Sequence, residues 1–427
     1  MDLVDGRFTV VGLSALEVLD SRGHPTLQVQ VRLGDGTTAV AGVPAGASTG
    51  SREAVEARDG DPDRYGGKGV LGAVAHVEGE LRELACSRPW NSVEQLDAVM
   101  VDADGTANKS RFGVNAIVGV SMAVARAAAG GQELFQALRP PGVSPRLPVP
   151  HFNVLNGGVH AGNALDFQEF MIAPVGAPSF AEAVRAGAGV YAALGGLLRR
   201  AGHDTGLGDE GGFAPQLERP EEVLSLLVGA IEAAGYTAGR EGVAIALDPA
   251  ASEFYRDGAY HVAGQVLSSA EMIERYAQIV VDFPVWSIED GLAEDDWGGW
   301  AKLTERLGDT TQIVGDDLFV TDPRIIAEAI DRGVGNAALI KPNQIGTVTE
   351  TLEAMRTCRT AGYAQMVSHR SGETCDSFIA DLAVGTGCGQ LKSGAPARGE
   401  RVAKYNRLLG IAADHPSLAY GLPEGVR

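Results

Sequence analysis

Six short apolar runs in the second half of the chain each end in a polar or charged residue, and segments with helical periodicity separate them. The runs end at Asp248, Glu289, Asp316, Lys341, His369 and Lys392. The steps between these ends are 41, 27, 25, 28 and 23 residues, which suits one strand, one helix and two loops apiece. Strands that alternate with helices form a parallel sheet. If this sheet closes into a barrel, all six polar residues meet at the mouth where barrel active sites are built.

The segments before these runs complete the expected fold. Apolar runs at 151–158 and 167–174 can supply the remaining strands, but they leave little room for a helix between them, so we expect a barrel that is irregular at its start. Prolines and glycine at 139–150 interrupt any helix or central strand and indicate a domain boundary. We therefore predict an α/β protein with an α+β domain at 1–140 and a barrel domain at 141–427.

Within the first domain, apolar and polar residues alternate at 26–33, which predicts a half-buried strand. A D-G-T turn follows, and 38–43 should pair back with that strand. The periodicity of 111–129 predicts a helix.

Composition and charge exclude several classes of protein. Apolar residues make up 45% of the 427 residues and aromatic residues 6%, as in an ordinary globular protein. The formal net charge of −20 repels phosphate backbones and anionic lipid, so neither nucleic acid nor a membrane is expected as a partner. The first ten residues are acidic where a secretory signal is basic, and the four cysteines form no C-x-x-C pair. We expect a cytoplasmic protein with incidental thiols.

Three of the strand-end residues are carboxylates, Asp248, Glu289 and Asp316, which come from consecutive strands. Oxygen ligands arranged around an open position suit Mg²⁺. The alternative is that each carboxylate caps a neighbouring helix. Because the three occur in register beside two lysines and a His-Arg pair, the metal site is favoured.

Lys341 follows A-A-L-I directly, so its stem should be buried in the barrel wall. A nearby divalent ion, Arg370 and Lys392 should lower its pKa and allow it to act as a general base. A lysine that only neutralises the carboxylates is about equally plausible from the residue alone. A base that faces a metal able to hold both oxygens of a carboxylate is suited to removing a proton α to that carboxylate.

The stretch S-H-R-S at 368–371 places several donors for an anion on successive residues. His369, Arg370 and Ser371 could hold a phosphate or a second carboxylate, with the guanidinium donating two parallel hydrogen bonds. The alternative, a surface turn, is weakened by the apolar residues that precede it. Glycines around Glu210 in L-G-D-E-G-G exclude a regular element there, and V-P-A-G-A-S-T-G at 43–50 suggests either a mobile lid or an ordinary loop.

Taken together, these motifs resemble the enolase family over nearly the whole chain. The matching segments include P-A-G-A-S-T-G, F-Q-E-F-M-I, G-D-E-G-G-F-A-P, S-I-E-D, V-G-D-D-L, K-P-N-Q-I-G-T and S-H-R-S-G-E-T. The resemblance implies a small α+β domain on an irregular eight-stranded TIM-like barrel, usually as a homodimer. It implies a lyase of glycolysis that dehydrates 2-phosphoglycerate, a small phosphorylated hydroxy acid, to phosphoenolpyruvate with two Mg²⁺ ions per active site.

The resemblance also implies roles for individual residues. Lys341 would take the C2 proton, and Glu210, with Glu169 beside it, would help the C3 hydroxyl leave as water. Asp248, Glu289 and Asp316 would bind the tighter Mg²⁺, and Ser48 would help to complete the second metal site. Arg370 and Ser371, with His369 beside them, would bind phosphate, Lys392 would lie on the carboxylate side, and Gln168 and His160 would line the pocket.

The chain departs from the usual family pattern at His24, Ala45, Val159, Gly291 and Cys375. None of these is a proton-transfer or metal residue, but Ala45 and Val159 lie on loops expected to close over the substrate. An alternative function is therefore a paralog of phosphonate biosynthesis, similar to carboxyphosphonoenolpyruvate synthase, that uses the same carbanion chemistry on 2-phosphoglycerate.

Two further alternatives belong to other classes. A binding protein with a retired active site is disfavoured because base, acid and metal carboxylates are all present. A mandelate-racemase-like enzyme would usually carry a K-x-K pair on an early strand, and 150–250 has none.

Overall fold

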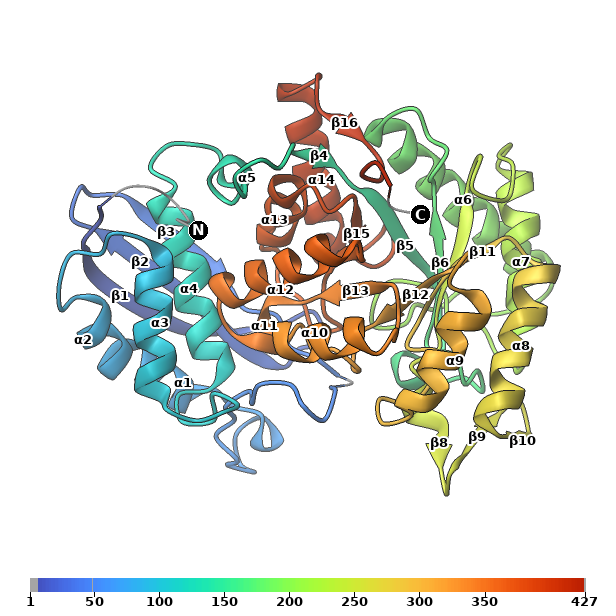
Figure 1. Ribbon diagram of the computed structural model, residues 1–427, viewed down its shortest axis with the longest axis horizontal. Helices are drawn as coiled ribbons and strands as arrows, with labels where there is room; N and C mark the ends of the chain where they lie inside the picture. The colour runs from blue at the N-terminus through green and yellow to red at the C-terminus, as the bar shows by residue number, and fades with distance from the viewer. Residues whose placement is uncertain (1–6, 48, 426–427) are drawn as a thin grey trace.

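The computed structural model describes residues 7–47 and 49–425. An amino-terminal part made of a sheet and helices lies beside a barrel that is surrounded by helices (Figure 1). The sheet has the antiparallel order β1 (Val10–Leu19), β2 (Pro25–Leu33) and β3 (Thr38–Gly42). Buried and exposed residues alternate along β2, since one face packs on helix α4 (Val114–Ala128) and the other faces outward.

The predicted strands at 26–33 and 38–43 and the predicted helix at 111–129 are confirmed as β2, β3 and α4. Strand β1, which the sequence reasoning did not single out, completes the sheet. The remaining elements of this part are the turns η1 (Tyr65–Gly67) and η2 (Val77–Leu81) and the helices α1 (Leu71–His76), α2 (Arg82–Ala85), α3 (Val93–Asp104) and α5 (Leu134–Ala137).

A closed barrel of eight strands forms the rest of the fold. In chain order its strands are β5 (Val149–Asn156), β6 (Glu169–Ala173), β7 (Ala244–Asp248), β11 (Val285–Glu289), β12 (Gln312–Gly315), β13 (Ala337–Ile340), β14 (Ala364–Ser368) and β15 (Gln390–Lys392). Every residue of these strands is buried, as expected for strands covered on both faces.

The barrel is irregular at its start, as predicted. Strand β6 runs antiparallel to both β5 and β7, whereas the other neighbouring strands are parallel. The reason is the short connection between β5 and β6, which holds only the 3₁₀ turn η3 (Gly158–His160) and is too short for a parallel crossover.

Helices cover the outside of the barrel (Figure 1). They are α6 (Phe180–Arg200), α7 (Pro220–Ala233), α8 (Ser269–Asp282), α9 (Trp297–Leu307), α10 (Pro323–Asp331), α11 (Pro342–Ile345), α12 (Val348–Ala361), α13 (Phe378–Thr386) and α14 (Gly399–Asp414). Several begin at a side-chain cap; Ser268, for example, forms a capping box with Glu271. None of the described helices has the length and sustained apolarity needed to cross a bilayer.

Smaller elements complete the fold: the turn η4 (Ala251–Phe254), the ribbon of β8 (Tyr255–Arg256), β9 (Ala259–Val262) and β10 (Gln265–Leu267), and the pair β4 (Arg146–Leu147) and β16 (Ala419–Tyr420).

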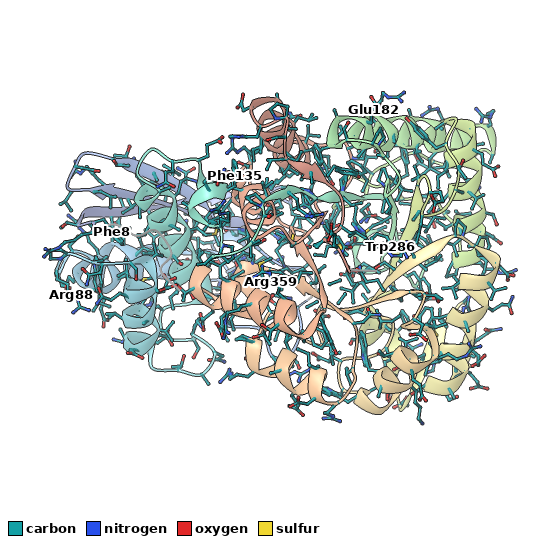
Figure 2. All side chains as sticks on the ribbon, turned by 45° about the horizontal axis from the view of Figure 1, so that its top comes forward. Phe8, Arg88, Phe135, Glu182, Trp286 and Arg359 are labelled. Atoms are coloured by element: carbon teal, nitrogen blue, oxygen red, sulfur yellow. The ribbon has the colours of Figure 1, made fainter. Side chains whose placement is uncertain are left out.

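The two ends of the barrel differ in polarity. Trp286, labelled in Figure 2, packs with Val149, Ala173 and Ala244 at the end where the parallel strands begin. This apolar packing fills the part of that end formed by β5, β6, β7 and β11. The polar strand-end residues lie at the opposite end, where a ligand site can form.

Candidate active site

Lys392 joins the carboxylates at the carboxyl end of the barrel. Its Nζ lies 2.9 Å from Asp248 Oδ2, 2.7 Å from Glu289 Oε1 and 3.1 Å from Glu169 Oε1. All four side chains are buried. The structure therefore brings strand-end residues of β7, β11 and β15 into one cluster, as the strand pattern predicted.

Burial controls the protonation of this cluster. Burial raises the pKa of Glu289 well above its ordinary value, and the neighbouring Asp248 carboxylate adds to the effect. Burial alone would lower the pKa of Lys392, but the surrounding carboxylates, led by Asp248, raise it well above its ordinary value. The lysine is thus held in its charged form.

Lys341 and Asp316 form a second pair at the same end. Lys341 Nζ lies 2.5 Å from Asp316 Oδ2; the Asp316 side chain is buried, and that of Lys341 is only 12% exposed. We expected a lowered pKa for Lys341. Burial, Arg370 and Lys392 do act in that direction, but the Asp316 carboxylate outweighs them and raises the pKa. The protein's own groups therefore shift this pKa upward, because the closest anion outweighs the neighbouring cations, whereas the expected lowering included a divalent ion as well.

Glu210 lies in the loop predicted for it, outside any helix or strand, and its side chain is buried. Asn153 Nδ2 donates to Glu210 Oε2 at 3.0 Å, and His369 Nε2 lies 3.1 Å from the same oxygen. Burial would raise the pKa of Glu210, but the neighbouring His369 and His160 imidazoles, the hydrogen bond from His369 and the Arg401 charge together hold it well below its ordinary value. Burial lowers the pKa of His369 to about 3, so its imidazole is neutral near pH 7.

Glu169 is the second carboxyl in this corner of the site. Ligand atoms of His160, Glu169 and Glu210 lie within 4.8 Å of one another. Burial, followed by the Glu210 charge, raises the pKa of Glu169 well above its ordinary value. The surroundings thus favour the neutral form of Glu169 and the ionised form of Glu210, and the two carboxyls titrate as a coupled pair.

The stretch after β14 is buried, so the alternative of a surface turn is wrong. His369, Arg370 and Ser371 are 2%, 3% and 5% exposed. The Arg370 guanidinium donates to both carboxylate oxygens of Glu53, at 3.0 and 3.1 Å, and to Asn343 Oδ1 at 3.1 Å. The guanidinium for which the sequence predicted an anion thus has a carboxylate of the protein itself beside it.

Buried polar atoms without a hydrogen-bond partner gather in the same place. They include Gln168 Oε1, Glu169 Oε2, Glu289 Oε2 and both ring nitrogens of His160. Leaving such atoms unpaired costs about 1 to 3 kcal/mol each. A concentration of them at one end of a barrel indicates a site built for a ligand.

Among the described residues, two groups hold carboxylate or imidazole ligand atoms that lie within 4.8 Å of one another. The first group is His160, Glu169 and Glu210, and the second is Asp290, Asp316 and Asp317. Of the three predicted metal ligands, Asp316 belongs to the second group; Asp248 and Glu289 belong to neither and lie against Lys392 instead. The donor set nevertheless fits Mg²⁺, because it consists of buried carboxylate oxygens and Glu289 Oε2 lacks a partner.

Ser48, the predicted ligand of the second metal ion, lies outside the described residues. Ala45, on the same loop, is fully buried, and its backbone N–H and C=O both form hydrogen bonds with the backbone of Gly372. Val159 is 48% exposed beside the buried His160. Of these two departures from the family pattern, Val159 therefore presents its side chain to solvent and Ala45 does not.

The sequence reasoning missed three residues of the site. Glu53 pairs with Arg370. Gln344 Nε2 donates to Asp316 Oδ1 at 2.8 Å and to Glu53 Oε1 at 3.2 Å. The buried Arg401 contacts His369 Nδ1 at 2.5 Å. A usable signal existed for Gln344, which follows Lys341 closely in K-P-N-Q. Nothing local in the sequence pairs Glu53 or Arg401 with β14.

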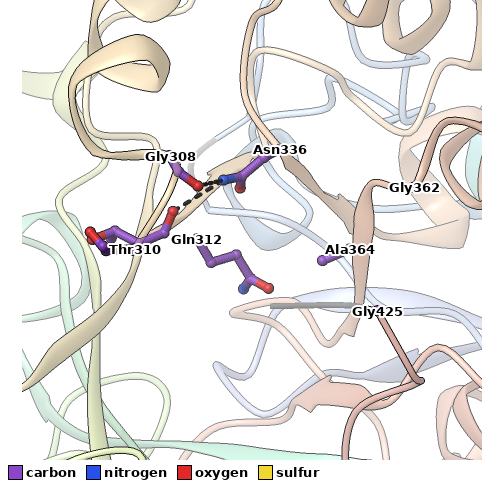
Figure 3. Close-up of a pocket in the computed structure, with 8 residues that line it drawn as sticks. Gly308, Thr310, Gln312, Asn336, Gly362, Ala364 and Gly425 are labelled. Atoms are coloured by element: carbon purple, nitrogen blue, oxygen red, sulfur yellow. Dashed lines mark hydrogen bonds between the residues drawn. The ribbon is translucent and has the colours of Figure 1, made fainter.

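A cavity of about 190 Å³ lies at the opposite end of the barrel, where β12, β13 and β14 begin (Figure 3). Asn336 Nδ2 donates there to the carbonyl oxygens of Gly308 and Thr311, each at 3.1 Å. None of the described residues that line this cavity is ionisable. It offers no acid, base or charge for chemistry, so the candidate active site is at the carboxyl end.

Comparison with known proteins agrees with this geometry. Residues 10–138 match the family model described as the enolase amino-terminal domain, and residues 144–420 match the enolase C-terminal TIM barrel domain. The enolase of Rubrobacter xylanophilus is 55% identical over 96% of this chain and 97% of its own length. The enolases of Acidothermus cellulolyticus and Beutenbergia cavernae are 55% and 53% identical over 94% of each chain. The chain belongs to the enolase family.

Proposed function

We propose that this protein dehydrates 2-phosphoglycerate to phosphoenolpyruvate, with Lys341 as the base and the Glu169–Glu210 pair as the acid. The observation that carries the proposal is the joining of a buried lysine, three strand-end carboxylates and a buried Arg-Ser anion site at one barrel mouth. Family membership and the enolase relatives support the same reaction. It is a carbon–oxygen lyase reaction of glycolysis.

Lys341 removes the proton from C2 of the substrate. For this it must be neutral, whereas Asp316 raises its pKa and holds its proton in the ligand-free protein. A cation bound at Asp316 would weaken this ion pair and leave burial, Arg370 and Lys392 to lower the pKa of Lys341. The pair therefore makes the base dependent on metal binding.

Asp248, Glu289 and Asp316 would hold Mg²⁺, and a second ion would be completed with Ser48 and the substrate phosphate. When bound, Mg²⁺ supplies positive charge that stabilises the negative charge developing on the substrate carboxylate. Lys392 lies beside Asp248 and Glu289 and would support that carboxylate from the same side. Arg370 and Ser371 would bind the phosphate, and Gln168 and His369 would line the pocket.

Glu210 and Glu169 act at the C3 hydroxyl of the substrate. The proton they share rests on Glu169 in the ligand-free protein, as the two opposite pKa shifts indicate. Its delivery through Glu210 lets the C3 hydroxyl leave as water. His160 Nδ1 faces both carboxyls at 3.8 Å from Glu210 and 3.9 Å from Glu169, which is beyond hydrogen-bond distance of either.

The paralog of phosphonate biosynthesis is not favoured, because the relatives at 53–55% identity are named enolases. The deciding experiment follows the absorbance of phosphoenolpyruvate when the protein meets 2-phosphoglycerate and Mg²⁺. Turnover on the order of 1 to 1,000 per second is expected. Negligible turnover with continued exchange of the α proton would instead support the paralog.

The proposal includes two domains that meet near residue 140, a homodimer and a cytoplasmic location. The two family models match on either side of that point. Leu19, 58% exposed on β1, and Val40 line a groove of about 560 Å³, so this face offers apolar area for a second copy. The four cysteines are free thiols, as is usual in the cytoplasm. Light scattering after size exclusion tests the dimer.

A further inference from the structure

Arg370 is paired with an anion of the protein itself. Its Nη1 lies 3.0 Å from Glu53 Oε2 and its Nη2 lies 3.1 Å from Glu53 Oε1. The Arg370 and Glu53 side chains are 3% and 8% exposed. Two parallel charge-assisted hydrogen bonds away from water form a strong, specific contact.

This contact uses the same chemistry that a phosphate requires. A guanidinium binds a phosphate most strongly when two of its N–H groups face two phosphate oxygens. Glu53 already takes the edge formed by Nη1 and Nη2, and Asn343 accepts from Nη1 as well. A phosphate that approaches this edge must therefore replace the Glu53 carboxylate.

Glu53 has other partners that remain when Arg370 is lost. Its Oε1 also accepts from the backbone N–H of Gly50 at 3.2 Å and from Gln344 Nε2 at 3.2 Å. A displaced Glu53 would thus not become a buried carboxylate without donors, which would be strongly unfavourable. Two donors besides Arg370 therefore already face Glu53 and could continue to satisfy its carboxylate if the contact with Arg370 were replaced.

We propose that Glu53 is an internal counter-anion of Arg370, that the substrate phosphate displaces it, and that it thereby sets the affinity of the phosphate subsite. The inference rests on the proposed function only for the role of Arg370. A carboxylate of the same chain competes at high effective concentration. A phosphate dianion, with more charge and more acceptor oxygens, can win this competition, whereas a ligand carboxylate meets a competitor of its own kind. Glu53 therefore favours phosphate over carboxylate at this position.

The test measures binding of inorganic phosphate to the metal-free protein by ³¹P NMR titration in EDTA. Glu53→Gln keeps the size of the side chain and removes its charge, so we expect the Kd for phosphate to fall about tenfold. Glu294→Gln is the matched control. Glu294 accepts from the Ser51 N–H at 3.1 Å, so this variant removes a charge near the same segment without touching the Arg370 pair. Its Kd should stay close to that of the unmutated protein.

An unchanged or larger Kd in Glu53→Gln would overturn the proposal, since it would mean that Glu53 positions Arg370 for phosphate or has no part in binding. Thermal unfolding checks that the variant is folded. If it is not, Glu53→Asp, which shortens the side chain by one methylene and retains the charge, should also tighten phosphate binding. Arg370→Ala tests the phosphate-binding role of Arg370 separately from the counter-anion role of Glu53. If phosphate binding is unaffected by Arg370→Ala, the proposed role of Arg370 itself fails.

Discussion

Lys341 Nζ lies 2.5 Å from Asp316 Oδ2, so the proposed base and a proposed metal ligand form an ion pair that is largely shielded from water, with side chains 12% and 9% exposed. The Asp316 carboxylate raises the pKa of Lys341 against the effect of burial, and the Lys341 ammonium in turn holds the pKa of Asp316 below its ordinary value although burial raises it. Asp316 therefore favours the protonated form of Lys341, which cannot act as a base, whereas Lys341 favours the ionised form of Asp316, which is the form that binds a metal. Under the proposed function, this contact would couple metal binding to activation of the base.

Replacing Lys341 by alanine should abolish exchange of the substrate α proton with solvent and lower turnover by at least about 10³-fold, because no other base is assigned to C2. Exchange in D₂O followed by proton NMR measures the first effect. Lys302→Ala removes an exposed lysine on α9 and should retain full exchange. Exchange that persists in Lys341→Ala would assign the base to another residue.

Glu210→Gln should spare α-proton exchange and stop dehydration, since Glu210 is assigned to the hydroxyl side of the substrate. Glu169→Gln should have a similar effect, because the shared proton rests on Glu169. The double variant should then lose little more than either single variant, as expected for groups that act as a unit. Loss of exchange together with dehydration in Glu210→Gln would show that Glu210 has another role.

Removal of divalent ions by EDTA should silence the enzyme, and Mg²⁺ should restore it. Binding of Mg²⁺ to the folded protein should also raise Tm in the absence of substrate, in proportion to the logarithm of the Mg²⁺ concentration above its Kd. Glu289→Gln should weaken this rise, because it removes one of the proposed ligands. Turnover that persists without metal, or a Tm rise that Glu289→Gln leaves intact, contradicts the assigned metal site.

Asp97 should make the stability of the protein depend on pH. It is buried in α3, where it accepts from Ser121 in α4 and Thr349 in α12, and burial raises its pKa to about 6. Because the folded-state pKa exceeds the unfolded one, the stabilising contribution of protonation is complete below about pH 4 and is lost as the pH rises through about 6. The shift corresponds to about 3 kcal/mol.

Asp97→Asn should therefore raise the free energy of unfolding at pH 8 by about 1 to 3 kcal/mol relative to the unmutated protein, and the difference should shrink towards pH 5. Urea unfolding at the two pH values measures it. Asp102→Asn, an exposed change on the same helix, should have no such pH dependence. Equal stabilities at pH 8 would mean that the hydrogen bonds from Ser121 and Thr349 keep Asp97 ionised.

Much of the barrel could be predicted from local sequence patterns. The runs that end at Asp248 and Glu289 are continuous apolar segments because the barrel strands are covered on both faces. The spacing between the two runs indicates that a helix lies between them. The close spacing of 151–158 and 167–174 likewise indicated the irregular start. Strand β1 was missed because its exposed leucines, Leu16 and Leu19, obscure its alternation.

Which side chains reach the barrel mouth follows from local properties of the chain, namely strand periodicity and the positions of strand ends. How those side chains pair does not. Glu53 and Arg370 are 317 residues apart, and no local pattern connects them. The pKa shifts likewise depend on the fold: Asp316 raises the pKa of Lys341, and the surroundings raise that of Glu169 and lower that of Glu210. Electrostatic effects depend on distance and burial, and those are properties of the folded molecule.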